Sequence, residues 1–155
     1  GAAMSPFNAF MFIQGLETLA LRMKEHSKNG AMVAEFLQNH PKVERVSHPS
    51  VADGFKKERA DNYLNGGCGG LMGFEIKGGL ESGKKFIESL EMFYHVANIG
   101  DSKSLAIHPA STTHSQLNEE ELLSGGVSPG YIRLSIGIEH IDDILEDLGN
   151  ALDNS

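Results

Sequence analysis

Arg133 is the residue whose type and setting most clearly suggest ligand chemistry. It lies in the segment from Tyr131 to Glu139, Y-I-R-L-S-I-G-I-E, in which alternate positions are aliphatic. Because successive side chains of a strand point to opposite faces, the aliphatic side predicts a buried face and places Arg133 on the other. A guanidinium carries a fixed fork of donors that matches both oxygens of a carboxylate. The strand predicts a carboxylate site or, as the plainer alternative, a surface ion pair.

Residues 98–114, N-I-G-D-S-K-S-L-A-I-H-P-A-S-T-T-H, form a second candidate stretch. Hydroxyl side chains and turn residues are dense there, and apolar periodicity is weak. Such a segment suits the recognition of a small polar ligand. Serine and threonine that satisfy their own backbone would have the same composition, so both interpretations stay open.

Other site chemistries find little support. The seven histidines lack metal-binding spacing, and His108 and His114 are separated by a proline. The glycine run at 66–70 lacks the Gly-Lys-Ser/Thr ending of a phosphate loop. Cys68 has no obvious activating base nearby in the sequence. We therefore predict no metal site and no catalytic nucleophile.

Composition limits the possible partners and compartment. The chain has 155 residues and a net charge of -8, which argues for a single domain and against nucleic acid or an anionic membrane as partner. One cysteine excludes an internal disulfide, and the sequence shows neither an apolar span nor a secretion signal. These features predict a cytoplasmic protein.

The elements that position these residues follow from periodicity. Ser5 and Pro6 predict a helix start, and helical spacing continues to Leu37, either as one bent helix or as two. Residues 47–69 suggest an irregular surface excursion. Strands are expected at 43–46, 71–77, 94–99, 104–107 and 131–139, and further helices at 81–92, after Asn118, and at 141–152. Several connections between strands are short, which predicts an α+β fold with a mixed, mainly antiparallel sheet, helices on one face, and Arg133 on the open face.

The first residues, G-A-A-M-S-P-F-N-A-F-M-F-I, are strongly apolar. Residues 7–13 would cover every side of a helix with apolar groups, so we expect an exposed patch that marks an interface. A native terminus is usually polar, and this opening suggests an interior segment of a longer protein.

Several long motifs carry a family resemblance. Two runs resemble the C-terminal part of the Cys/Met-metabolism pyridoxal-phosphate enzymes. They are N-I-G-D-S-K-S-L-A-I-H-P-A-S-T-T-H-S-Q-L and G-V-S-P-G-Y-I-R-L-S-I-G-I-E-H-I-D-D-I-L-E-D-L. Three further segments resemble the same family: the opening helix, H-P-K-V-E-R-V, and G-C-G-G-L-M-G-F-E-I-K-G-G. The O-acetylhomoserine sulfhydrylase branch is the most similar. The resemblance implies that residues 1–155 are the small C-terminal domain of a fold type I transferase, with a long linking helix over 1–40 and the α+β sheet over 41–155.

The resemblance also implies residue roles. In this family an arginine and a serine of the small domain bind the α-carboxylate of the amino-acid substrate, which points to Arg133 and Ser104, with Thr113 as a weaker candidate. The lysine that holds pyridoxal phosphate would lie in a larger N-terminal domain, absent here, so this chain alone is expected to bind cofactor poorly and to be inactive. The parent enzyme would be a homo-oligomer, typically a tetramer. Cystathionine γ-synthase and the cystathionine or methionine γ-lyases remain alternatives, as does a non-catalytic α+β module for binding or assembly.

Overall fold

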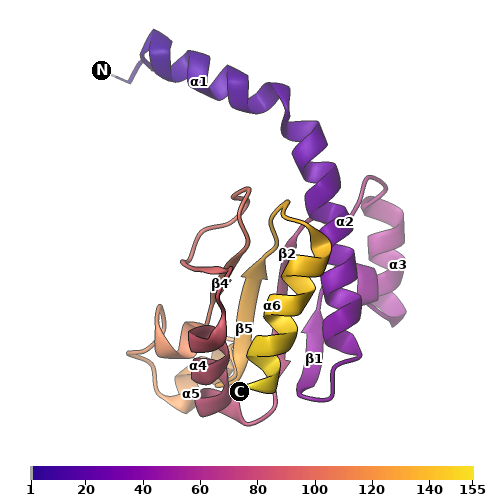
Figure 1. The fold of residues 1–155 in the computed structure, drawn as a ribbon, viewed down its shortest axis with the longest axis vertical. Helices are drawn as coiled ribbons and strands as arrows, with labels where there is room; N and C mark the ends of the chain where they lie inside the picture. Colours follow the sequence, from indigo (N-terminus) through magenta and orange to yellow (C-terminus); the bar gives the residue numbers. More distant parts are fainter. Residues whose placement is uncertain (1) are drawn as a thin grey trace.

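The computed structural model describes residues 2–155 and begins with two helices (Figure 1). Helix α1 (Pro6–Glu17) starts where expected, because Ser5 Oγ accepts a hydrogen bond from the amide of Asn8 at 3.2 Å. Helix α2 (Leu19–Gln38) follows after Thr18, whose backbone leaves helical geometry. The two-helix alternative is therefore the correct one, and the break allows α1 to project away from the sheet (Figure 1).

The sheet has the order β1-β2-β5-β4-β3. Its strands are β1 (Val43–Ser47), β2 (Leu71–Ile76), β3 (Tyr94–His95), β4 (Leu105–Ile107) and β5 (Tyr131–Ser135). All neighbouring strands are antiparallel except β3 and β4, which confirms the mixed, mainly antiparallel prediction. Arg133 lies in β5, the central strand of the sheet, with Gly73 opposite it in β2 and Ile107 opposite it in β4.

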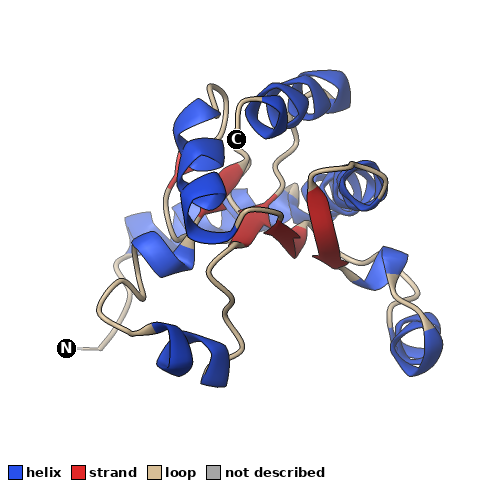
Figure 2. Ribbon diagram, turned by 90° about the horizontal axis from the view of Figure 1, so that it is seen from below, coloured by secondary structure: helices blue, strands red, loops and turns tan. Residues whose placement is uncertain are grey.

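Helices α2, α4 (Gly79–Ser89) and α6 (Ile141–Asp153) pack on one face of this sheet and on one another (Figure 2). The aliphatic side of β5 is buried against them, as its alternation predicts. The same core contains apolar residues of β2, α2, α4 and α6, including Phe74, Val33, Phe86, Ile144 and Leu148. The opposite face of β5 carries Tyr131, Arg133 and Ser135.

The prediction of an irregular excursion over 47–69 is wrong in part. That segment contains a 3-10 turn η1 (Pro49–Val51) and helix α3 (Gly54–Tyr63). Helix α3 buries none of its residues, so it has no apolar stripe that a period analysis detects. Its run of Lys, Glu, Arg and Ala still favours a helix through intrinsic propensity.

Two shorter elements complete the path from β4 to β5. A 3-10 turn η2 (Pro109–Ser111) follows β4, and helix α5 (Glu119–Ser124) precedes the loop into β5. The predicted cap of α5 is confirmed: Asn118 and Glu121 exchange side-chain and backbone hydrogen bonds in a capping box.

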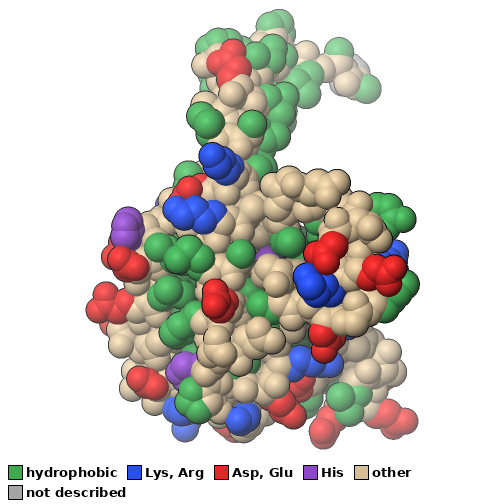
Figure 3. Space-filling model, turned by 90° about the vertical axis from the view of Figure 1, so that its right-hand side faces the viewer, with side chains coloured by type: hydrophobic (Ala, Val, Ile, Leu, Met, Phe, Trp, Pro, Cys, Tyr) green, Lys and Arg blue, Asp and Glu red, His purple; other side chains and the backbone are tan. Residues whose placement is uncertain are grey.

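Helix α1 exposes its large apolar side chains, as the sequence predicts. Figure 3 shows hydrophobic side chains gathered along the segment that protrudes from the body of the molecule. The exposed residues are Phe7, Phe10, Met11, Phe12, Ile13 and Leu16. A patch of this kind indicates a contact surface. No helix within residues 2–155 combines the length and the apolar character needed to cross a membrane.

Candidate carboxylate-binding site

Arg133 is half-buried on the open face of β5. Its Nη2 donates a hydrogen bond to the backbone carbonyl of Asn98 at 3.3 Å. Among residues 2–155, no carboxylate forms an ion pair with this guanidinium. The plainer alternative, an arginine held in a surface ion pair, is thus not what the described residues show. The remaining donors of the fork are suited to an anion that the chain itself does not supply.

The loop that carries Asn98 is attached to the strand along its length. Ser135 Oγ accepts from the amide of Gly100 at 3.0 Å, and the amide of Ile138 donates to the carbonyl of Ser102 at 2.9 Å. The sequence marked this stretch as a candidate ligand segment but did not single out Asn98. A backbone carbonyl has no side-chain signature, so no pattern in the sequence could have identified it.

Ser104 is fully buried at the base of the same loop. Its Oγ donates to Glu139 Oε2 at 2.9 Å and accepts from the amide of Gly137 at 2.9 Å, while its own amide donates to Glu139 Oε1 at 2.6 Å. The structure thus brings Ser104 to the junction of the loop and the strand that carries Arg133. Its hydroxyl, however, is turned toward Glu139, a residue that sequence reasoning did not select.

Thr113 lies just beyond η2 and is exposed. Its Oγ1 shares a hydrogen bond with the neighbouring His114 Nδ1 at 2.9 Å. No hydrogen bond joins Thr113 to the loop of Arg133 among the described residues. The structure therefore connects Arg133 with Ser104 through the loop, but leaves Thr113 outside that network.

His108 holds the turn that leads to Thr113. Its ring is fully buried, with Nε2 2.7 Å from the carbonyl of Pro129 and Nδ1 2.8 Å from Ser111 Oγ. A carbonyl only accepts, so Nε2 carries the proton and Nδ1 accepts from the serine hydroxyl. Burial lowers the pKa of His108 below its ordinary value, which favours this neutral form. His108 thus ties η2 to the loop that precedes β5.

Helix α2 fixes the backbone just after β5. The buried His26 has its Nδ1 2.7 Å from the carbonyl of Ile136. Asn29 Nδ2 donates to the carbonyls of Gly137 and Glu139 at 3.2 and 3.0 Å. The segment that carries Glu139 is thereby held from the helical side of the sheet, while Ser104 holds it from the loop side.

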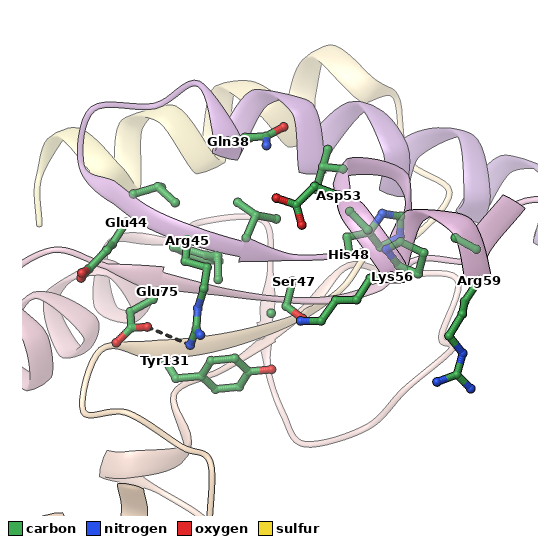
Figure 4. Close-up of a pocket in the computed structure, with 18 of the residues that line it drawn as sticks. Gln38, Glu44, Arg45, Ser47, His48, Asp53, Lys56, Arg59, Glu75 and Tyr131 are labelled. Atoms are coloured by element: carbon green, nitrogen blue, oxygen red, sulfur yellow. Dashed lines mark hydrogen bonds and ion pairs between the residues drawn. The ribbon is translucent and has the colours of Figure 1, made fainter.

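A separate hollow of about 1000 Å³ lies beside β1, β2, η1 and α3 (Figure 4). Arg45 Nη2 in this hollow is 3.1 Å from Glu75 Oε2, and Lys56 reaches in from α3 toward the sheet. Tyr131 contributes its ring from β5, but Arg133 is not among the lining residues. The hollow and the Arg133 fork are therefore two distinct features of the molecule.

Comparison with known proteins gives the family. The profile of the Cys/Met metabolism PLP-dependent enzymes matches residues 1–153. This chain belongs to that family. It is 57% identical over 155 residues to an O-acetyl-L-homoserine sulfhydrylase of Leptospira meyeri, a match that covers 99% of this chain and 35% of the relative. It is also 44% identical to a homocysteine synthase of Schizosaccharomyces pombe, over 99% of this chain and 36% of the relative.

A solved structure from the same family agrees in fold. The O-acetylhomoserine (thiol)-lyase of Campylobacter jejuni superposes with a TM-score of 0.88 at 45% identity, over 99% of this chain and 36% of that one. The predicted α+β fold, that of the C-terminal region of a fold type I PLP enzyme, is thereby confirmed. The chain spans about a third of the length of these family members.

The family depends on pyridoxal phosphate, and the Campylobacter structure contains a pyridoxyl-lysine in a region outside the part that matches this chain. Lys103 lies in the same loop as Asn98 and is the lysine of that loop. It is exposed, donates to Tyr94 Oη at 3.0 Å and lies 4.4 Å from the centre of that ring. The hydrogen bond to Tyr94 raises the pKa of Lys103, so its amine stays protonated, whereas an amine must be neutral to attack an aldehyde. Lys103 therefore does not fit the role of the lysine that holds the aldehyde cofactor.

Proposed function

We propose that this chain is the substrate-carboxylate-binding domain of an O-acetylhomoserine sulfhydrylase. The whole enzyme would form homocysteine from O-acetyl-L-homoserine and sulfide, with pyridoxal phosphate held by a larger N-terminal domain. Pyridoxal phosphate supplies an electron sink for such chemistry. The role of this chain is to bind and orient the amino-acid substrate.

The unpaired fork of Arg133 is the observation that carries the proposal. Arg133 is half-buried on a strand whose other face packs on the core, so the sheet fixes the point from which its side chain extends. One of its donors meets the Asn98 carbonyl, and the others lack a carboxylate partner in residues 2–155. A substrate α-carboxylate would accept two parallel hydrogen bonds there. Fixing that carboxylate helps to orient the Cα–H bond, which is a positioning contribution to catalysis.

Ser104 and Thr113 belong to the proposal in different ways. Ser104 uses its hydroxyl and its amide on Glu139, so it supports the loop that faces Arg133. The exposed hydroxyl of Thr113 is a further proposed donor to the substrate once the two domains close around it.

The proposal is tested with Arg133→Lys in the full-length gene product. Lysine keeps the charge but loses the paired donors, and a hydrogen bond to a charged group contributes about 1.5–3 kcal/mol. The KM for O-acetylhomoserine should therefore rise by roughly ten- to a hundredfold, because about 1.4 kcal/mol corresponds to a factor of ten. Steady-state assays of homocysteine formation measure this change.

Arg45→Lys is the matched control, because Arg45 lies on the same sheet but forms an exposed pair with Glu75. That variant should keep the KM of the unmodified enzyme. An unchanged KM in Arg133→Lys, with a normal far-ultraviolet circular dichroism spectrum, would contradict the carboxylate role.

A second activity within the family has specific support. The chain is 41% identical to an L-methionine γ-lyase of Pseudomonas putida, over 98% of this chain and 38% of that enzyme. A substrate panel of O-acetylhomoserine with sulfide, cystathionine and methionine separates the candidates, including cystathionine γ-synthase. Faster cleavage of methionine or cystathionine than conversion of O-acetylhomoserine would replace our proposal with a lyase. Tight amino-acid binding by the isolated chain in calorimetry would favour the non-catalytic module instead.

Two further assignments are part of the proposal. We assign the protein to the cytoplasm, as expected for a chain with a single cysteine. We also assign the exposed apolar side of α1 to contacts with the N-terminal domain and with other subunits of a homotetramer. Light scattering of the full-length enzyme measures its mass, and a monomer would contradict the second assignment.

A further inference from the structure

We propose that Glu139 is a positioning residue for substrate binding, acting through Arg133. Its carboxylate clamps the loop of residues 98–104 against the strand, and the clamped loop presents the Asn98 carbonyl that directs the guanidinium. This inference rests on the proposed function, since it assigns a support for the carboxylate site.

The clamp is a two-pronged hydrogen-bonded contact. Glu139 Oε1 accepts from the Ser104 amide at 2.6 Å, and Glu139 Oε2 accepts from the Ser104 hydroxyl at 2.9 Å. The same hydroxyl accepts from the Gly137 amide at 2.9 Å. Hydrogen bonds to a carboxylate are about twice as strong as those between neutral groups. Both ends of the short segment 137–139 are therefore fixed to one serine of the loop.

Close approach of the backbone at Gly137 makes this arrangement possible. A Cβ at that position would collide with Glu139 Oε2 and with the carbonyl of Ser102. The amide of Ile138 donates to that same Ser102 carbonyl at 2.9 Å. The loop and the strand extension thus meet with no room for a side chain between them.

A continuous set of contacts then runs from the clamp to the guanidinium. The loop is held at Ser104 by Glu139, and at Gly100 by Ser135 Oγ. Asn98 comes two residues before Gly100 in the same loop, and its carbonyl accepts from Arg133 Nη2. A free arginine side chain samples many rotamers and loses that freedom when it is ordered. A loop that supplies a fixed acceptor orders the guanidinium before the substrate arrives, which improves binding.

The experiment uses Glu139→Ala and Glu139→Gln in the full-length enzyme, alone and combined with Arg133→Lys. We expect Glu139→Ala to raise the KM for O-acetylhomoserine about tenfold, with kcat changed less than threefold. Glu139→Gln should raise the KM less, because the glutamine carbonyl can still accept from the Ser104 amide. In the Arg133→Lys background, Glu139→Ala should add little to the KM, because both changes act on one contact.

Glu58→Gln is the matched control for loss of a negative charge, since Glu58 lies exposed on α3 and is not placed in the binding machinery. It should leave KM and kcat unchanged. Inhibition by an amine analogue without the carboxylate provides a further readout: its inhibition constant should be the same in Glu139→Ala and in the unmodified enzyme, whereas general damage to the site would weaken it.

The outcomes separate this inference from the proposed function. If Arg133→Lys raises KM but neither Glu139 variant does, the positioning role is overturned and the proposed function stands. If the effects of Arg133→Lys and Glu139→Ala multiply fully, Glu139 acts independently of Arg133 and the inference also fails. If Arg133→Lys itself has no effect, the carboxylate site is lost and the inference with it. Should Glu139→Ala not fold, Glu139→Gln and Ser104→Ala carry the same comparisons.

Discussion

Gly83 in helix α4 lies against the buried ring of His108, and alanine at this position should destabilise the fold. A Cβ on Gly83 would lie 2.5 Å from His108 Nε2 and 2.9 Å from both Cδ2 and Cε1. The ring cannot move aside freely, because its nitrogens are hydrogen-bonded to Pro129 and Ser111. The added methyl group must displace either the helix or the ring.

The size of the effect follows from opposing contributions. Alanine is favoured over glycine in a helix interior by about 0.8–1.0 kcal/mol. Overpacking a buried site costs about 1–3 kcal/mol. If His108 moves and leaves a buried polar group without its partner, that loss adds about 1–3 kcal/mol. With the ring displaced, these contributions sum to a loss of about 1–5 kcal/mol in the free energy of unfolding for Gly83→Ala.

Gly149→Ala is the matched control, the same substitution in helix α6. Its Cβ would lie 3.7 Å from Phe36 Cζ, an ordinary contact, so the helical preference for alanine should raise stability by about 0.5–1 kcal/mol. Urea unfolding followed by circular dichroism measures the free energy of unfolding of both variants. The m value, the slope of that free energy against urea concentration, should stay unchanged. A Gly83→Ala chain as stable as the unmodified chain, or stabilised as much as Gly149→Ala, would refute the packing argument.

Two further predictions concern pH and a buried carboxylate. Burial lowers the pKa values of His48 and His108 below their ordinary 6.5, so below that pH the unfolded chain binds protons that the folded chain resists. The free energy of unfolding should therefore fall as pH decreases from 7 toward 5, by at most about 1.4 kcal/mol per pH unit for each histidine. Urea midpoints measured across this range should depend less steeply on pH in His48→Gln than in the unmodified chain. A urea midpoint of the unmodified chain that does not change with pH would contradict the assignment. The buried Asp147 accepts from the amides of Glu91 and Met92 at 2.9 and 3.0 Å. Asp147→Ala should lower the free energy of unfolding by about 1–3 kcal/mol, and Asp147→Asn, which keeps one acceptor, by less; equal midpoints for the two variants would argue against this capping role.

Elements with a buried side were predictable because burial leaves a period in the sequence. Strand β5 and helix α6 each place their apolar residues at the spacing of their own geometry, and both were found. Helix α3 was missed because it buries no residue and so has no period to detect. The predicted strand over 131–139 is also too long: β5 ends at Ser135, and the partly exposed Ile138 lies beyond it.

Within the candidate site, sequence could point only to residues whose side-chain type itself suggests a role. Arg133 was selected because a guanidinium can bind a carboxylate and because its motif, R-L-S-I-G-I-E, resembles that of the family's substrate-binding arginine. Asn98 acts through its carbonyl, which every residue possesses. Glu139 acts on Ser104, a residue 35 positions away in the chain. Neither contact has a local pattern.

The order of residues alone determined the family, the face of β5 on which Arg133 lies and the helical face of the sheet, because these depend on alternation and on long local motifs. Only the folded chain decided that Ser104 turns its hydroxyl to Glu139 and that the Asn98 carbonyl meets Arg133. Those contacts join segments far apart in sequence, and a hydrogen bond depends on distance and direction that are set when the sheet, loop and helices pack together.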